Sequence, residues 1–307
     1  MAEISGFEFE VLSLLKDQFI KICGNRPFEV TTIGRTELKE QFYLEELGDN
    51  LITSFSPKIQ VQYEQGGGNE IRKKMRALRS SSAMTFNIFG NDDAKILDDS
   101  GVYQTFELEF EKQHKTLKAS ASKAKANLDA LLYNPETKQA YACEMKLAEW
   151  LFSSPTDLNV KYENVDCYDY QEAAIVFTPI AQTLRTQKAS FRVYDANQVF
   201  KHTLACYNYC KEMQGTNQEI TKLTLLNCVW ELPNPKLIDA HQVNYLKRLK
   251  EERKGSLDFN NLMQPVIPLF KSIGVDFDIQ YISLGDFLKK LDLGQAHRDY
   301  LKRYTFN

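Results

Sequence analysis

Apolar positions near the start of the chain recur with the spacing of a helix. They predict helices over residues 7–22 and 37–47, because residues three and four apart lie on one helical face. Residues 54–63 show a shorter, more strand-like pattern. We therefore expect residues 1–65 to form an N-terminal extension that is mainly helical.

A run of three glycines at 66–68 interrupts the pattern. Asn69 is a suitable N-cap for a helix that runs to about Phe89, and Gly90 is suited to end it. Residues 105–112 then alternate between large apolar side chains and glutamates. That alternation predicts a half-buried strand with the glutamates on its outer face.

The next segment predicts a β-hairpin. A polar, lysine-rich connection over residues 112–125 leads into two strands, 127–133 and 141–147, which flank a turn at 135–138. If Asn134 faces Gln139 across this turn, the pairing of all the other hairpin positions follows from it.

The remaining pattern predicts further helices and two strands. A helix begins at Asp195 or Asn197, strands cover 223–232 and 275–282, and helices lie near 239–252, 260–272 and 284–303. From residue 69 onward the order is helix, three strands, helix and strand. This order predicts an α/β fold of the α+β kind, with a mixed sheet and flanking helices. We expect one domain over 1–307, with its core at about 69–231 and a C-terminal extension over 232–307.

The composition narrows the class of protein. A chain of 307 residues with 43% hydrophobic residues forms a real core and is not disordered. The net charge of −3 gives no overall basic signature, so nucleic-acid binding would depend on local patches. The six cysteines lack a disulfide or zinc spacing and are expected to be reduced. The first residues lack a signal peptide and no stretch is apolar enough to span a membrane, so we expect a cytoplasmic protein.

Three charged residues lie in the predicted hairpin where apolar residues would be expected. The pairing places Asp129 opposite Glu144, at a typical separation of about 5 Å between Cβ atoms. Lys146 projects to the same face as Glu144, two positions further along the strand. Two carboxylates this close repel each other, and Mg²⁺ or Mn²⁺ would relieve that repulsion. The hairpin therefore predicts a divalent metal site.

The Glu-x-Lys triplet alone is weak evidence for this site. The chain contains three other copies, at 37–39, 136–138 and 252–254, whose settings indicate a helix surface or a turn. The alternative is a cross-strand ion pair on a solvated face, between Lys146 and either Asp129 or Glu144.

The hairpin and the elements around it resemble the restriction-endonuclease-like, or PD-(D/E)XK, nuclease superfamily. That superfamily has an αβββαβ core, with an Asp on its second strand and (Asp/Glu)-x-Lys on its third. Asp129 matches the first position, and Glu144 and Lys146 match the second. Leu128 stands where the superfamily name has Pro. The resemblance covers about half the chain, and the first 60 and last 75 residues carry no sign of it.

A second stretch, from Gly67 through Arg79 to Gly90, is similar to the first-helix segment of bacterial members of the superfamily. In such members a helix Glu adds to the metal site, which implies this role for Glu70. The alternative for Glu70 is an acid in the first turn that stabilises the helix dipole.

The resemblance implies a metal-dependent nuclease that hydrolyses phosphodiester bonds in DNA with a metal-activated water. Asp129 and Glu144 would bind the ion, and Lys146 would position the water and stabilise charge on the phosphate. A homodimer would suit cutting of both strands.

Basic residues near the hairpin in sequence are candidates for phosphate contact. They form two runs, one on the predicted helix of Glu70 and one before the hairpin, and a solvated surface is the alternative for both. A polar residue at the start of the helix after the third strand joins them, because some nucleases of the superfamily place a site residue there. The candidates are Arg72, Lys73, Arg76, Arg79, Lys123, Lys125 and Gln198.

Two other functions stay open. A catalytically inactive protein that keeps the nuclease fold would act as a nucleic-acid-binding or assembly module, and another metal-dependent phosphohydrolase would act on small substrates. His202, Cys206 and Cys210 also share a helical face, but the lack of a fourth ligand favours a packing stripe over a metal site.

Overall fold

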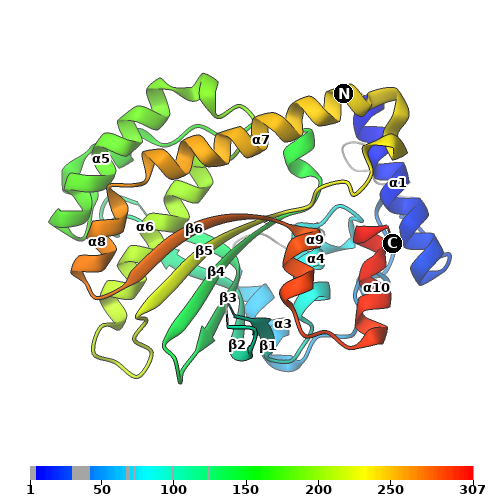
Figure 1. The fold of residues 1–307 in the computed structure, drawn as a ribbon, viewed down its shortest axis with the longest axis horizontal. Helices are drawn as coiled ribbons and strands as arrows, with labels where there is room; N and C mark the ends of the chain where they lie inside the picture. Colours follow the sequence, from blue (N-terminus) through cyan, green and yellow to red (C-terminus); the bar gives the residue numbers. More distant parts are fainter. Residues whose placement is uncertain are drawn as a thin grey trace.

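A six-stranded mixed sheet forms the centre of the molecule (Figure 1). The computed structural model describes residues 5–29, 42–66, 70–71, 74–98, 100–122 and 125–306. The strands follow in sequence order across the sheet, antiparallel from β1 to β4 and parallel from β4 to β6. Their bounds are β1 Ala94–Leu97, β2 Tyr103–Lys115, β3 Lys125–Asn134, β4 Gln139–Lys146, β5 Lys222–Val229 and β6 Asp276–Ser283.

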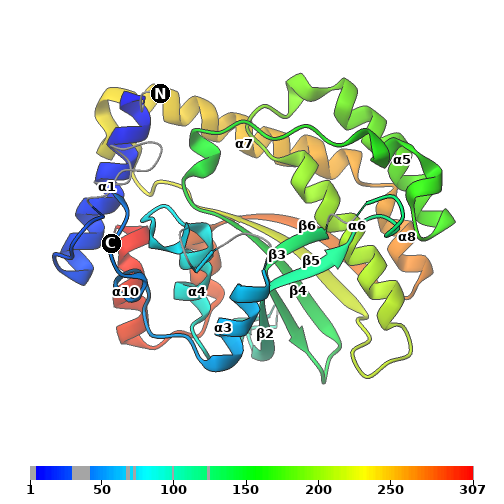
Figure 2. The same ribbon diagram turned by 180° about the vertical axis from the view of Figure 1, so that it is seen from behind.

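Helices cover both faces of this sheet (Figures 1 and 2). Those of the N- and C-terminal parts pack on one face, and those of the central part pack on the other. The first group comprises α1 Gly6–Cys23, α3 Pro57–Gln65, α4 Ser81–Phe89, α9 Leu284–Lys290 and α10 Gln295–Thr305. The second comprises α5 Gln171–Thr186, α6 Ala196–Met213 and α8 Val266–Ser272.

Helix α7, Gln242–Leu262, links the two sides. It runs along one end of the molecule from the region of α1 to that of α8 (Figure 1). Tyr245, near its start, belongs to the core of α1 and α4, whereas Phe259, near its end, belongs to the core of α5 and α6. The observed architecture is a mixed sheet between helical layers, which confirms the predicted fold class.

The predicted strand over residues 54–63 is wrong, because this segment forms α3 instead. Ser56 caps the helix by accepting a hydrogen bond from the backbone N–H of Ile59, and Pro57 suits the first turn. Ile59 and Tyr63, one turn apart, are buried, whereas Val61 between them is 47% exposed. The segment therefore buries every fourth residue rather than every second.

The predicted helix from Asn69 to Phe89 is too long. Residues 67–69 lie outside the described residues, and α4 begins only at Ser81, where Ser80 accepts a hydrogen bond from the N–H of Ala83. Before that point the backbone pairs with another segment, since Leu78 donates to the carbonyl of Phe42. This pairing uses N–H groups that a continuous helix would need for itself.

The predicted helix over 37–47 falls partly outside the described residues, which resume at Phe42. From Tyr43 onward the chain forms isolated bridges, Tyr43 to Ala77 and Leu44 to Phe28, so the predicted helix does not continue past Phe42. The strand predicted over 105–112 is confirmed within β2, which continues to Lys115 and so shortens the predicted loop before the hairpin.

The end of the chain adds more than helices. β6 pairs with β5 in parallel and extends the same sheet, and β1, which the sequence pattern did not indicate, extends it at the other edge.

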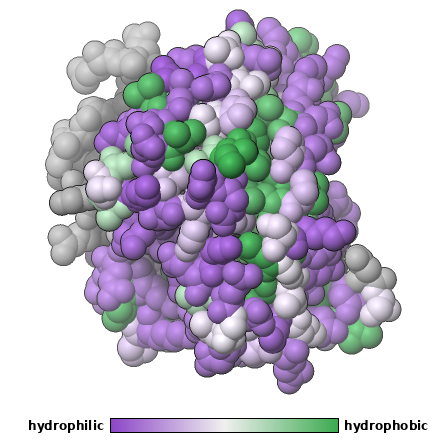
Figure 3. Space-filling view, turned by 90° about the vertical axis from the view of Figure 1, so that its left-hand side faces the viewer, coloured by the Kyte–Doolittle hydropathy of each residue, from purple (hydrophilic) through white to green (hydrophobic). Residues whose placement is uncertain are grey.

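No described helix is long and apolar enough to cross a membrane. The face on the side of α5 and α8 carries patches of hydrophobic side chains among hydrophilic ones (Figure 3). Exposed apolar residues on these helices include Ile175 and Ile267.

Candidate catalytic site

The hairpin of β3 and β4 has the predicted register. Asn134 pairs with Gln139, and the ladder continues to Ala130 opposite Cys143. The next position places Asp129 beside the end of β4, where the backbone N–H of Met145 donates to Asp129 Oδ2 at 2.7 Å. A backbone contact thus fixes one oxygen of the carboxylate.

Lys146 closes a triangle of polar contacts on this face. Its Nζ lies 2.7 Å from Glu144 Oε1 and donates to Gln198 Oε1 at 2.5 Å. Gln198 Nε2 in turn donates to Glu144 Oε1 at 2.8 Å. Gln198 lies in the first turn of α6, where Asp195 caps the helix by accepting from its N–H. The end of β4 and the start of α6 together hold the three side chains.

The ion pair expected under the alternative exists, but its setting differs. The Lys146 side chain is 17% exposed and that of Glu144 is 4% exposed, so the pair is not on a solvated face. Removing two charges from water costs free energy that a single contact repays only in part. A buried pair of this kind is weak evidence for a stabilising role alone.

His202 also faces Glu144, although sequence reasoning placed it in a packing stripe. Its Nε2 lies 3.2 Å from Glu144 Oε2, and both side chains are almost fully buried. Glu144 Oε2 has no hydrogen-bond partner among the described residues. A signal for His202 was available, because it lies four residues after Gln198 and so shares its helical face.

Glu70 reaches the site from outside any helix. It is 7% exposed, and its two oxygens accept hydrogen bonds from Ser82 Oγ at 2.9 Å and Lys74 Nζ at 2.8 Å. Because Ser82 lies in the first turn of α4, the carboxylate is held at the start of that helix rather than on it. The sequence prediction thus named the residue but assigned it to the wrong element.

Glu111 is a further buried acid that the alternation of β2 placed on the outer face. It is 5% exposed and has φ +52°, and the ladder between β2 and β3 is interrupted at this position, opposite Asp129. Its Oε2 accepts a hydrogen bond from Asn127 Nδ2. Burial raises the pKa of Glu111 to about 7, and the negative charges of Glu70 and Glu144 add to the effect.

The site holds more carboxyl groups than one lysine can neutralise. Burial raises the pKa of Asp129 well above its usual range, with further contributions from Glu144 and Glu111. Burial also acts to raise the pKa of Glu144, but Lys146 and His202 outweigh it and lower that pKa to about 2. Burial disfavours the charge on Lys146, yet Glu144 and Glu149 raise its pKa above the usual range. Lys146 is therefore a stable ammonium group.

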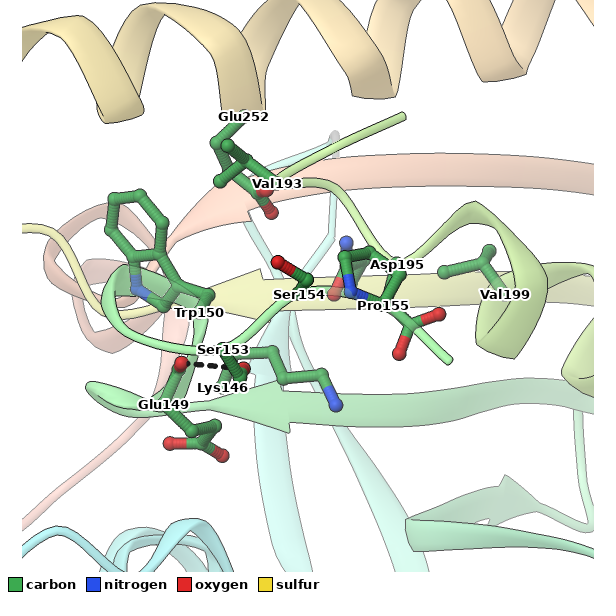
Figure 4. A pocket seen from close by; sticks show the side chains of 11 residues that line it. Lys146, Glu149, Trp150, Ser153, Ser154, Pro155, Val193, Asp195, Val199 and Glu252 are labelled. Carbon is green, nitrogen blue, oxygen red and sulfur yellow. Dashed lines mark hydrogen bonds between the residues drawn. The ribbon is translucent and has the colours of Figure 1, made fainter. Parts of the chain in front are cut away.

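These side chains line an open cavity of about 720 Å³. Its walls come from the middle of β3, the end of β4, the starts of α4 and α6, and the segment that precedes α4. The residues discussed above that line it are Glu70, Lys74, Ser82, Asp129, Glu144, Met145, Lys146 and Gln198. A second, smaller cavity of about 50 Å³ also borders Lys146, and Figure 4 shows its lining, with Glu252 reaching in from α7.

Residues 28–305 match the model of one protein family, described as restriction endonuclease associating with ARP. The match covers most of the chain, including N- and C-terminal parts that carry no sign of the nuclease resemblance described above. The chain belongs to this family. No curated protein and no solved structure matches it. Membership supports a nuclease-like function and is consistent with the resemblance of the hairpin to that of PD-(D/E)XK nucleases.

In this restriction-endonuclease family member the described residues contain no group of three or more His, Cys, Asp or Glu side chains placed to hold a metal ion. The donor chemistry nevertheless fits Mg²⁺, which commonly binds one or two carboxylates and keeps several waters. Glu144 Oε2 is a buried oxygen without a hydrogen-bond partner among the described residues. The carboxylates of Asp129 and Glu144 also repel each other, which raises the pKa of Asp129. Asp129 and Glu144 are thus suitable ligands for such an ion.

The candidates for nucleic-acid contact separate in the folded chain. Arg72, Lys73 and Lys123 lie outside the described residues. Arg76 is turned toward Glu45 and Glu29, away from the cavity lining. Arg79 lines the cavity and pairs with Glu8 at 3.0 Å.

The two remaining candidates differ in exposure. Lys125, at the start of β3, is exposed and donates to Gln113 at 3.3 Å. Gln198 bridges Glu144 and Lys146, as described above. Among the described candidates, the structure brings Arg79 and Gln198 to the cavity wall.

Proposed function

We propose that this protein is a metal-dependent nuclease that hydrolyses phosphodiester bonds in DNA. The observation that carries the proposal is the placement of Asp129, Glu144 and Lys146 on the wall of one open cavity, in a chain of a restriction-endonuclease family. Surplus carboxylate charge at this wall creates a demand for a cation, and a phosphate brought beside a cation and an ammonium group would be polarised for attack by water.

Asp129 and Glu144 would hold Mg²⁺ or Mn²⁺, which when bound supplies Lewis-acid polarisation and charge neutralisation at the phosphate. Lys146 would hold the attacking water and stabilise the negative charge that develops on the phosphate oxygens. Its raised pKa suits this electrostatic role, because the ammonium stays charged over the working pH range. Glu70 would support the ion through water, since both its oxygens already accept hydrogen bonds.

The rim of the cavity suits a polyanion. Lys74, whose side chain is 59% exposed, and Arg79 line the same cavity as the acids. Salt bridges to Glu70 and Glu8 hold them in place, and a phosphate would compete with those partners. Cutting of both strands of a duplex would further require two sites, which favours a homodimer.

Cleavage of single-stranded DNA, duplex DNA and RNA with Mg²⁺ or Mn²⁺ tests the proposal directly. Cleavage should disappear with EDTA and in Lys146→Ala and Glu144→Ala, while circular dichroism shows a retained fold. Lys138→Ala is a matched control, because Lys138 ends another Glu-x-Lys triplet but pairs with Glu219 outside the cavity. Unchanged cleavage in both site variants would refute the assignment.

One observation favours an inactive binding or assembly module instead. Glu144, Lys146 and Gln198 already satisfy one another in a closed triangle, and the family is described as associating with ARP. Calorimetry with Mg²⁺ separates the two functions. Binding that is lost in Asp129→Ala supports the nuclease, and the absence of any metal response supports the module.

A further inference from the structure

Hydrolysis by water, the proposed function on which this inference rests, requires a proton acceptor. Of the titratable residues described above, Glu111 and His202 do not line the open cavity. Lys146 is protonated, and Asp129 and Glu144 are the proposed ligands of the cation. Both oxygens of Glu70 accept hydrogen bonds from protein donors. An attacking water needs another base within reach, since general-base catalysis typically contributes about 10²–10⁴-fold in rate.

Glu149 has the position that this role requires. It begins the 3₁₀ turn Glu149–Leu151, three residues after Lys146, and it lines the same open cavity as Asp129 and Glu144. Figure 4 shows its carboxylate pointing away from Glu252. Glu149 shares the wall of the open cavity with Asp129 and Glu144, the candidate metal ligands.

The two oxygens of Glu149 have different environments. Oε1 accepts a hydrogen bond from Ser81 Oγ, at the first residue of α4. Oε2 is buried and has no hydrogen-bond partner among the described residues. A buried acceptor without a hydrogen-bond partner lowers stability by about 1–3 kcal/mol. We therefore expect a bound molecule, such as water, to donate a hydrogen bond to this oxygen. An oriented carboxylate with one free oxygen is suited to receive a proton from a bound water.

We propose that Glu149 is a catalytic residue that accepts the proton of the water attacking the phosphorus. As the new O–P bond forms, one O–H bond of the water breaks and its proton passes to Glu149 Oε2. The P–O bond to the leaving sugar oxygen breaks, and that oxygen takes a proton from bulk water. Glu149 then returns its proton to solvent through the open cavity, which completes the cycle without another reactant.

The charges around Glu149 suit a base of moderate strength. Burial raises its pKa above the usual range for a glutamate, and Glu144 acts in the same direction. The positive charges of Lys146 on β4 and Arg79 before α4, and a hydrogen bond from the backbone N–H of Glu149 itself, act to lower this pKa. A base whose pKa lies nearer to the working pH accepts a proton more effectively.

Single-turnover cleavage by Glu149→Gln tests the proposal. Gln keeps the size of the side chain and can still bond to Ser81, but it is a far weaker base. The rate should fall by about 10²–10⁴-fold. Ser81→Ala, which frees the carboxylate to rotate, should give a smaller loss. Glu252→Gln is the matched control, because Glu252 is another buried carboxylate near Lys146 that does not line the open cavity, and its rate should stay at the wild-type level.

Three further measurements distinguish a base from a structural residue. Calorimetry should show that Glu149→Gln binds Mg²⁺ as the wild type does. The wild-type rate should rise with pH through the pKa of Glu149 and the variant rate should not. In the metal-free protein, a ¹³C-carboxyl NMR resonance that titrates above the usual Glu value of about 4.3 should be missing in the variant.

The outcomes separate this inference from the function on which it rests. A wild-type protein that cleaves and a Glu149→Gln variant with an unchanged rate would overturn the inference alone. An equal loss of rate in Glu252→Gln would also overturn it, because the effect would then be a general one of charge near Lys146. A wild-type protein that cleaves no nucleic acid would overturn the proposed function and this inference together.

Discussion

Lys146 and Arg303 are both buried cations, but their surroundings differ. Arg303, on α10, is 2% exposed and donates to Asn50 Oδ1 at 2.6 Å and to Tyr300 OH at 2.8 Å. Its guanidinium also lies 4.6 Å from the centre of the Phe19 ring of α1. Its partners are neutral, and together they join the N- and C-terminal helices.

The surroundings of Lys146 are charged and incompletely paired. It contacts Glu144 directly, and Glu149 lies near enough to raise its pKa. Glu144 Oε2 and Glu149 Oε2 are buried without hydrogen-bond partners among the described residues. The open cavity reaches this region, whereas it does not reach Arg303.

The contrast shows which buried charges indicate chemistry. Neutral donors and acceptors can satisfy a buried cation completely, and the result is a rigid joint. Surplus carboxylates beside a buried cation leave hydrogen-bond acceptors unpaired, and this lowers the stability of the fold. Such an arrangement is retained where a ligand or substrate supplies the missing partner. Four predictions test this distinction.

The largest expected effect is the loss of cleavage in Lys146→Met. Methionine keeps much of the length of the side chain but removes the charge that would stabilise the phosphate, so the rate should fall by about 10²–10³-fold. The stability of the fold, measured by urea denaturation, should change far less. A variant that loses stability and keeps its rate would show that Lys146 belongs with Arg303 as a structural residue.

Arg303→Met should have the opposite profile. It leaves Asn50 and Tyr300 without their donor and removes the contact with Phe19, so the free energy of unfolding should fall by about 3 kcal/mol. The folded fraction should cleave at the wild-type rate. Lys302→Met is the control, because the side chain of this neighbour is 40% exposed and forms a surface ion pair with Asp299.

Asp129→Asn should stabilise the metal-free protein while it abolishes the response to metal. The pKa of Asp129 is raised in the fold, whereas an unfolded Asp titrates near about 3.9. Between these two values the folded state binds more protons, so wild-type stability should fall as the pH rises. The asparagine removes this loss and should raise the free energy of unfolding by about 1–2 kcal/mol at neutral pH.

Thermal melts of Asp129→Asn from pH 4 to pH 8 measure this effect. Asp98 provides a control of opposite sign, because hydrogen bonds from Ser100 and Val102 lower its pKa to about 2. Its contribution should be lost as the pH falls, and Asp98→Asn should remove it. Equal pH profiles for wild type and Asp129→Asn would contradict the account of surplus charge.

The smallest expected effect is that of Gln198→Ala. Gln198 orients both Glu144 and Lys146 without bearing charge, so its loss should lower the cleavage rate by about tenfold, which corresponds to about 1.4 kcal/mol of activation free energy. Asn197→Ala is the neighbouring control, since Asn197 bonds only to the carbonyl of Thr156 in the described structure. A variant more active than the wild type would indicate that the triangle around Lys146 holds the site closed.

Local patterns predicted the hairpin well, because its register depends on one turn and on the two-residue period of strands. The pairing of Asn134 with Gln139 is confirmed, and its register brings Asp129, in the middle of β3, beside the end of β4 that carries Glu144. Gln198 was also named in advance, although as a nucleic-acid contact. The position of its side chain, between Glu144 and Lys146, depends on where α6 packs.

One error came from a missed local signal, and the others came from segments whose structure is decided at a distance. Residues 54–63 have a strand-like pattern, yet Ser56 and Pro57 start a helix there. The helix of α4 is short because the preceding residues pair with residues 42–44. Glu111 alternates outward by pattern, but its backbone turns into the left-handed region and the side chain is buried.

The sequence by itself determined the α/β class, the hairpin and the three charged residues that it carries, because strand and helix periods are properties of neighbouring residues. Only the tertiary structure decided that Glu70, Glu111, Glu149, Gln198 and His202 gather around those three. The packing of α4, α6 and the strands positions these side chains. Burial then sets the pKa values and leaves acceptors unpaired, and no local pattern encodes either effect.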